Sequence, residues 1–203
     1  MQKRGSLRLA LAAGTLVAAV ALWTAAFFTD FANVNFGNGT DGSGIGANNR
    51  FNIQVVGTDA NGNPQPGTWQ EADTVDGASI NIPGADTIIP GDTVSVEIPF
   101  RNESPSLKAV MKFSLLDRPG HASDRLMRDT LQYTVQLDNN TALVTDVKQD
   151  QVKNLSLGTL AAGESHVLKV SVKLPKQPTQ DDDNKFNGLV SYVQAHFDAQ
   201  SDK

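Results

Sequence analysis

The chain has 203 residues, with 17 Lys+Arg against 22 Asp+Glu, so its net charge is -5 and its isoelectric point is about 5.1. This acidic balance argues against nucleic-acid binding, which needs a basic face to displace phosphate counterions. Because the chain has no Cys, it has no disulfide framework, no thiolate nucleophile and no Cys-ligated metal site. Its length is typical of one domain, with or without a processed segment.

The N-terminus has the pattern of an export signal. Three cations lie in residues 1–8, and the 20 residues from Leu9 to Phe28 carry no charge. Such a pattern is typical of a signal peptide or of a membrane anchor, since the apolar run is long enough to span a bilayer. The run is rich in Ala and has small residues, Thr24 and Ala26, at the two positions that a signal peptidase inspects. We therefore predict a signal peptide over residues 1–26, cleaved before Phe27, with an uncleaved anchor as the alternative.

Cleavage would leave an acidic, exported protein, with 14 Lys+Arg against 22 Asp+Glu and a net charge of -8. Its first segment, residues 27–50, has Phe27, Phe28 and Phe31 near its start and continues as a Gly/Asn/Ser-rich tract over residues 35–49. Such a tract cannot bury enough apolar surface to offset its ordering entropy. The sequence therefore predicts a flexible mature N-terminal segment, followed by a folded domain over residues 51–200.

Apolar and polar residues alternate along much of residues 51–200, which is the period of a half-buried strand. The clearest runs, 94–100 and 107–115, are predicted to form a hairpin with one apolar face. Loops are predicted at 59–67 and 176–185, and a short helix at 123–130, capped by Ser123. Further strands are predicted at 51–55, 79–82, 131–137, 143–147, 168–174 and 189–197.

Eight to ten short strands with turn signals between them favour an all-β domain, a two-sheet antiparallel sandwich. Amphipathic runs of 10–15 residues with helical period are not found between the strands, and this argues against a parallel α/β sheet. The fold class is therefore an all-β sandwich preceded by an N-terminal signal helix.

The sequence does not nominate a catalytic, cofactor-binding or metal-ligating residue. It has no HExxH or GxSxG motif, and its histidines occur singly, as surface or edge residues that only the fold could bring together. A GxGxxG match at residues 37–42 continues into the polar Gly/Asn tract rather than into a helix, so it is interpreted as linker. The three histidines are His121, His166 and His196.

Two acidic segments could hold a cation only weakly. Asp59, Asn61 and Asn63 resemble the start of a calcium loop, but Pro64 stands where that loop needs Gly and its closing Glu is also absent. Turn chemistry explains this cluster better. The run at residues 181–183 is three aspartates, and such runs are usually solvated.

Several segments together resemble the TasA/camelysin family of secreted proteins. Residues 24–30 (TAAFFTD) are similar to the junction cut by a SipW-type signal peptidase. Residues 89–104, with IPGDTV and FRNES, residues 157–165 (LGTLAAGES) and the closing segment 187–200 (ending FDAQ) resemble that family's conserved segments in their usual order. The chain departs from the family pattern in its Gly-rich insertion before Phe51 and in Ala162, where Pro is usual.

The resemblance implies a jelly-roll sandwich secreted to the cell surface or biofilm matrix. Some members polymerise into fibres, in which the mature N-terminal segment enters a neighbour's sheet as a donor strand. The corresponding residues here would be Phe27, Phe28 and Phe31. The partners would then be other copies of the chain and other surface or matrix components, with the signal peptidase acting during export, and no cofactor is expected.

Two other functions stay open on the sequence. Camelysin relatives are described as metallopeptidases, so a secreted metallopeptidase is one alternative, although no ligand motif supports it. The other is a monomeric surface adhesin or a minor component of a fibre that other proteins assemble.

Overall fold

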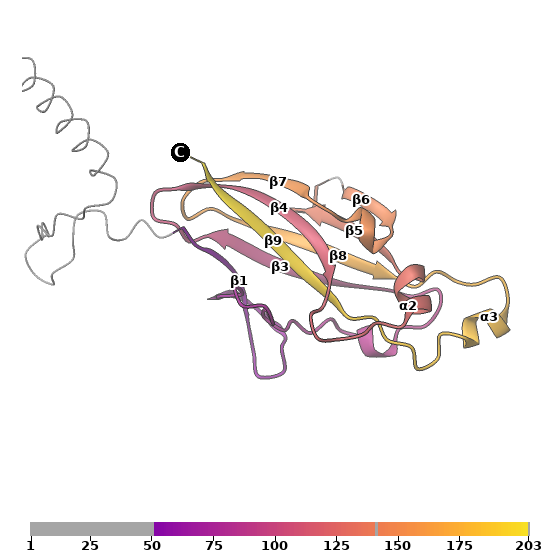
Figure 1. Ribbon diagram of the computed structural model, residues 1–203. Helices are drawn as coiled ribbons and strands as arrows, with labels where there is room; N and C mark the ends of the chain where they lie inside the picture. The colour runs from indigo at the N-terminus through magenta and orange to yellow at the C-terminus, as the bar shows by residue number, and fades with distance from the viewer. Residues whose placement is uncertain (1–50, 141, 203) are drawn as a thin grey trace, which may run out of the picture. The chain divides into compact units, whose positions relative to one another are not determined.

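The computed structural model describes residues 51–140 and 142–202 (Figure 1). These residues belong to one compact unit, Asn48–Lys203. The predicted signal helix lies outside the described residues. So do the predicted cleavage residues Thr24, Ala26 and Phe27, and the predicted donor-strand residues Phe28 and Phe31.

The described residues form nine strands and four short helical turns. The strands are β1 (Ile53–Thr58), β2 (Pro64–Gln70), β3 (Thr93–Asn102), β4 (Lys108–Asp117), β5 (Gln132–Leu137), β6 (Ala142–Val147), β7 (Leu155–Leu160), β8 (Ser165–Lys173) and β9 (Val193–Asp202). The helical turns are η1 (Ala85–Thr87), α2 (Arg125–Thr130), η2 (Gln149–Gln151) and α3 (Gln180–Asn184).

The strands pair into two sheets, and every pairing is antiparallel. The larger sheet has the order β2-β1-β3-β8-β5-β6, and the smaller one has the order β7-β4-β9 (Figure 1). The protein is therefore an all-β, two-sheet antiparallel sandwich, as the alternation of the sequence predicts.

Apolar residues at every second position form the core between these sheets. In the larger sheet, Val96, Val170 and Val135 lie side by side on three neighbouring strands. In the smaller sheet, Phe113 is fully buried, and its ring centroid is 5.2 Å from that of Phe197. Burying a side chain of this size contributes about 1.5–3 kcal/mol, so these rows supply much of the stability.

The predicted hairpin of residues 94–100 with 107–115 is wrong. Both runs are strands, but β3 pairs with β1 and β8 in the larger sheet, whereas β4 pairs with β7 and β9 in the smaller one. Alternation shows that each strand has one apolar face. It does not show whether two such faces lie side by side in one sheet or face each other across the core, as they do here.

The predictions for residues 59–67 and 79–82 are also wrong in part. Residues 64–67, predicted as loop, belong to β2, an edge strand, where a proline is tolerated because one side of the backbone needs no partner. Residues 79–82, predicted as strand, form no ladder. Ile80 and Ile82 still pack against the core, so the apolar pattern reports burial and not strand pairing.

Two helix predictions need correction. Ser123 does not cap α2, because its hydroxyl accepts a hydrogen bond from the Tyr192 amide at 2.8 Å and Asp124 occupies the N-cap position. Residues 180–184, predicted as solvated loop, form α3. There Asp183 is buried; it accepts a hydrogen bond from the Gln177 amide at 2.9 Å and forms an ion pair with Lys176.

Candidate functional site

Three of the four edge strands are interrupted in ways that oppose further pairing. The strand β2 contains Pro64 and Pro66. The pairing of β6 with β5 shifts register twice, and the pairing of β7 with β4 shifts register next to Gly158, whose φ is +88°. Prolines, bulges and short length are the usual protection of an exposed edge against pairing with another chain.

The fourth edge strand, β9, has none of these interruptions. Its ten residues pair with β4 in an unbroken register, and in the described part of the chain no strand pairs with its other side. The β4 residues that face the core are buried, but the residues opposite them on β9 stay exposed or half-buried. These β9 residues are Ala195, Phe197, Ala199 and Ser201. The sandwich is therefore open along β9.

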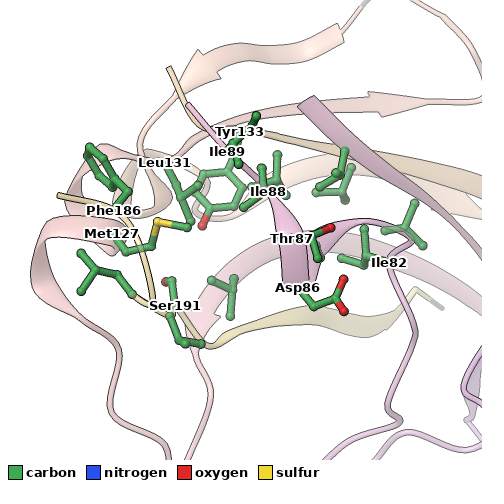
Figure 2. Close-up of a pocket in the computed structure, with 18 of the residues that line it drawn as sticks. Ile82, Asp86, Thr87, Ile88, Ile89, Met127, Leu131, Tyr133, Phe186 and Ser191 are labelled. Carbon is green, nitrogen blue, oxygen red and sulfur yellow. The ribbon is translucent and has the colours of Figure 1, made fainter. Parts of the chain in front are cut away.

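A cavity of about 500 Å³ lies between the sheets where β3 begins (Figure 2). Its walls come from β3, β5 and β8 of the larger sheet, from β4 and β9 of the smaller sheet, from α2, and from residues 82–90 and 186–191. Most lining side chains are aliphatic, and no lysine or arginine of residues 51–140 or 142–202 lines it. The rim includes Ile89 and Val190, which are 60% and 44% exposed. The cavity can therefore receive an apolar group from outside.

Two hydroxyl groups in the cavity wall lack a hydrogen-bond partner among the described residues. They are the Tyr133 hydroxyl and Ser191 Oγ, both buried from water (Figure 2). Tyr133 is only 1% exposed. Burial raises the pKa of Tyr133, and the negative charge of Asp117 raises it further, so the hydroxyl keeps its proton and can donate a hydrogen bond.

At the other end of β3, the side chain of Asn102 joins the two sheets. It is fully buried, and its Nδ2 donates to the carbonyl oxygens of Leu107 at 2.7 Å, Ala161 at 3.2 Å and Leu160 at 3.3 Å. Its Oδ1 accepts from the Ser104 amide at 3.0 Å. The contacts join the FRNES and LGTLAAGES segments that carry the family resemblance. The structure thus gives these segments a structural role.

The IPGDTV segment has a similar role at the cavity end. The Gly91 amide donates to the Leu174 carbonyl at 2.7 Å, and the Leu174 amide donates to the Asp92 carbonyl at 3.1 Å. Gly91 has a φ of +106°, which a side chain would strain. This turn therefore attaches the start of β3 to the end of β8.

Of the three histidines, only His166 has carboxylate partners in the part of the chain that the structure describes. Its Nδ1 contacts Asp138 and its Nε2 lies 3.3 Å from Glu164, so the carboxylates bind opposite sides of the ring and do not converge. His121 contacts the Pro119 carbonyl at 3.0 Å, and His196 is exposed on β9. Within the described ranges, no three His, Asp or Glu side chains are placed to hold a metal ion.

Burial alone would raise the pKa of Asp138, but a hydrogen bond from the Val167 amide and the contact with His166 outweigh it and lower that pKa. The sequence contains no signal for this pair, because the two residues are 28 positions apart and meet only through strand pairing.

The residues that resemble a calcium loop bond to one another. Asp59 Oδ1 accepts from the amides of Asn61 at 2.8 Å and Asn63 at 2.9 Å, and its Oδ2 accepts from the Asn63 side chain at 2.9 Å. The hydrogen bond from the Asn63 side chain is the main reason that the pKa of Asp59 is lowered. These contacts are those of an Asx turn, so turn chemistry accounts for the cluster.

No protein-family model and no curated protein matches the sequence. Among solved structures, the chain is similar to a family 123 glycoside hydrolase from Clostridium perfringens, with 12% identity and a TM-score of 0.24. The match covers 57% of this chain and 19% of the hydrolase, and a likeness this weak carries no argument about activity. In the described part of the chain, the helices are too short or too polar to cross a bilayer.

Proposed function

We propose that the protein is a secreted, non-enzymatic cell-surface or matrix protein of the TasA/camelysin type, with a jelly-roll sandwich that self-associates through an N-terminal donor strand. The observation that carries this proposal is the edge of β9, which is long, regular and unpaired in the described part of the chain. The other three edges have the interruptions that oppose such pairing.

The chemistry of the β9 edge suits an added strand. A strand laid along β9 would satisfy the unpaired backbone groups, and its alternate side chains would cover the half-open core face. Ala195 and Ala199 have small side chains on that face, which leaves room for larger ones from the incoming strand. Phe27, Phe28 and Phe31 would supply such side chains, and the Gly-rich tract 35–49 would be the tether.

The first test removes the donor segment. A chain lacking residues 27–35 is expected to be exported as a folded monomer that forms no fibres in electron microscopy or light scattering, whereas the intact mature chain forms them. Fibres from the truncated chain would refute the donor-strand proposal. An intact mature chain that stays monomeric at high concentration would favour the monomeric adhesin or minor fibre component.

The second test blocks the acceptor edge. Ala195→Lys places a charge on the core-facing side of β9, at a position already exposed in the monomer, and inward-pointing charges prevent edge pairing. We expect fibres to be lost without a change in monomer folding. His196→Lys, one residue further on the opposite face, is the matched control and should still polymerise. Equal polymerisation of both variants would show that β9 is not the acceptor.

The metallopeptidase alternative has no supporting cluster in the described residues. Metal analysis of the purified protein, combined with a protease assay, distinguishes it from the proposed function. Stoichiometric zinc together with peptide turnover would replace our proposal.

A further inference from the structure

The cavity at the beginning of β3 has features of a ligand site that pairing along β9 does not explain. Its volume of about 500 Å³ falls within the range of small-molecule sites, about 300–1,000 Å³. Its wall combines many aliphatic side chains with a few polar groups, which is the usual composition of such sites. Exposed Ile89 and Val190 at its rim extend the apolar surface to the solvent.

The Tyr133 hydroxyl is the strongest indication of a ligand. It lies in an apolar wall with no partner among the described residues, and leaving a buried hydroxyl unpaired is unfavourable. Phenylalanine would fill the same space without that cost. Figure 2 shows Tyr133 beside Leu131 and Ile88 among the lining residues. A ligand acceptor could reach the hydroxyl if Met127, a flexible residue of the same wall, shifts.

The charges around the cavity restrict the ligand's polar group. Asp86 lines the cavity, and the negative charge of Asp117 acts on Tyr133. Among the described residues, no cation lines the wall to compensate a negative charge on the ligand. Because Tyr133 stays protonated, its hydroxyl offers a donor to an uncharged acceptor. An anionic head group, by contrast, would be repelled and would lose its hydration without a counter-charge.

We propose that this cavity binds a neutral amphiphile, a molecule with an alkyl body and one uncharged oxygen that accepts a hydrogen bond from Tyr133. Long-chain alcohols, ketones and esters belong to this class. The alkyl body lies between the two sheets, and the oxygen lies at the wall formed by β5 and α2. The proposal does not depend on self-association, because the cavity belongs to a single copy of the chain.

The test uses the full exported chain and the fluorescent probe N-phenyl-1-naphthylamine, displaced in turn by 1-decanol, decane and decanoate at pH 8. We expect saturable displacement, with 1-decanol the tightest and decanoate the weakest of the three. Tyr133→Phe should lower the affinity for 1-decanol about fivefold, the equivalent of one hydrogen bond of about 1 kcal/mol, and leave the affinity for decane unchanged. Tyr192→Phe, which changes the only other tyrosine in the sequence, is the control and should change neither the 1-decanol affinity nor the decane affinity.

A second variant tests the location. Thr87 is exposed and lines the cavity, so Thr87→Trp should fold normally and place a large side chain in the cavity wall. This variant should bind the probe with an affinity more than tenfold lower. Three results would overturn the proposal: no saturable displacement in the wild type, equal 1-decanol affinity in wild type and Tyr133→Phe, or undiminished probe binding by Thr87→Trp. Fibre formation by these variants is a separate readout, so failure of this proposal is distinguishable from failure of the proposed function.

Discussion

The two ends of β3 are built in opposite ways. At its C-terminal end, Asn102 is fully buried, and its side-chain amide bonds to the Leu160 carbonyl of the other sheet and to backbone groups of the neighbouring loops. At its N-terminal end, the sheets separate around a cavity, and the buried hydroxyl of Tyr133 has no hydrogen-bond partner in the described part of the chain. The first end has the properties of a structural joint. The second has unused apolar surface and unused hydrogen-bonding capacity, which are the properties that binding requires.

Truncating core leucines should give the largest effect and should separate the closed core from the cavity. Leu168 is fully buried in β8, away from the cavity. The substitution Leu168→Ala should therefore lower the free energy of unfolding by about 4 kcal/mol. Leu131 lies in the cavity wall, where its neighbours already pack incompletely. Leu131→Ala should therefore lower the free energy of unfolding by only about 2 kcal/mol. Urea denaturation measures both. Equal losses would show that the cavity is filled in solution.

Removing the Asn102 contacts at the C-terminal end of β3 should have the next largest effect. Asn102→Ala leaves the carbonyls of Leu107, Leu160 and Ala161 without their donor and should lower the free energy of unfolding by about 3 kcal/mol. Asn81→Ala, which removes one exposed side-chain hydrogen bond to Asn63, is the matched control and should cost less than about 0.5 kcal/mol. A loss below about 1 kcal/mol for Asn102→Ala would contradict the role of this residue.

A smaller effect on the free energy of unfolding is expected from the carboxylate of Asp138, and this effect depends on pH. Since the pKa of Asp138 is lower in the folded protein, its carboxylate stabilises the fold above about pH 4, and this contribution disappears as pH falls through the folded pKa. Asp138→Asn keeps a side chain that tolerates the positive φ of 50°. It should cost about 1 kcal/mol at pH 7, after allowance for solvent screening, and less at pH 3, where the carboxylate of the unfolded chain is mostly protonated.

The control for this pH dependence is Asp76→Asn, which changes an exposed carboxylate in a loop. Its unfolding free energy should stay within about 0.5 kcal/mol of the wild type at both pH values. If Asp138→Asn destabilised the protein equally at pH 3 and pH 7, the carboxylate charge would not be the cause.

The smallest effect should come from the cavity hydroxyl. Tyr133→Phe removes an unpaired buried group without changing the packing of the ring, so the melting temperature should stay the same or rise by a few degrees. A clear fall in melting temperature would mean that the hydroxyl has a partner in solution. The same variant in the ligand assay then reports on binding alone.

Alternation along the chain predicts most strands, because it depends on local contact with a core. The alternating apolar residues of β3 and β4 are found as predicted, but their assignment to different sheets is not. That assignment depends on pairing between distant strands, and the Asn102 contacts between the sheets likewise join residues up to 59 positions apart. The cavity is equally hidden in the sequence, since Tyr133 is a regular inward residue of β5 and its missing partner is a property of the assembled wall.

The order of strand pairing also has a kinetic consequence. Apart from β1 with β2 and β5 with β6, the paired strands come from distant parts of the chain: β3 joins β8, and β4 joins β9 more than 70 residues later. Such non-local topologies fold slowly, on a timescale of about milliseconds to seconds. Until β9 pairs with it, one edge of β4 has no partner strand, so the refolding chain transiently exposes an open edge that the finished protein conceals.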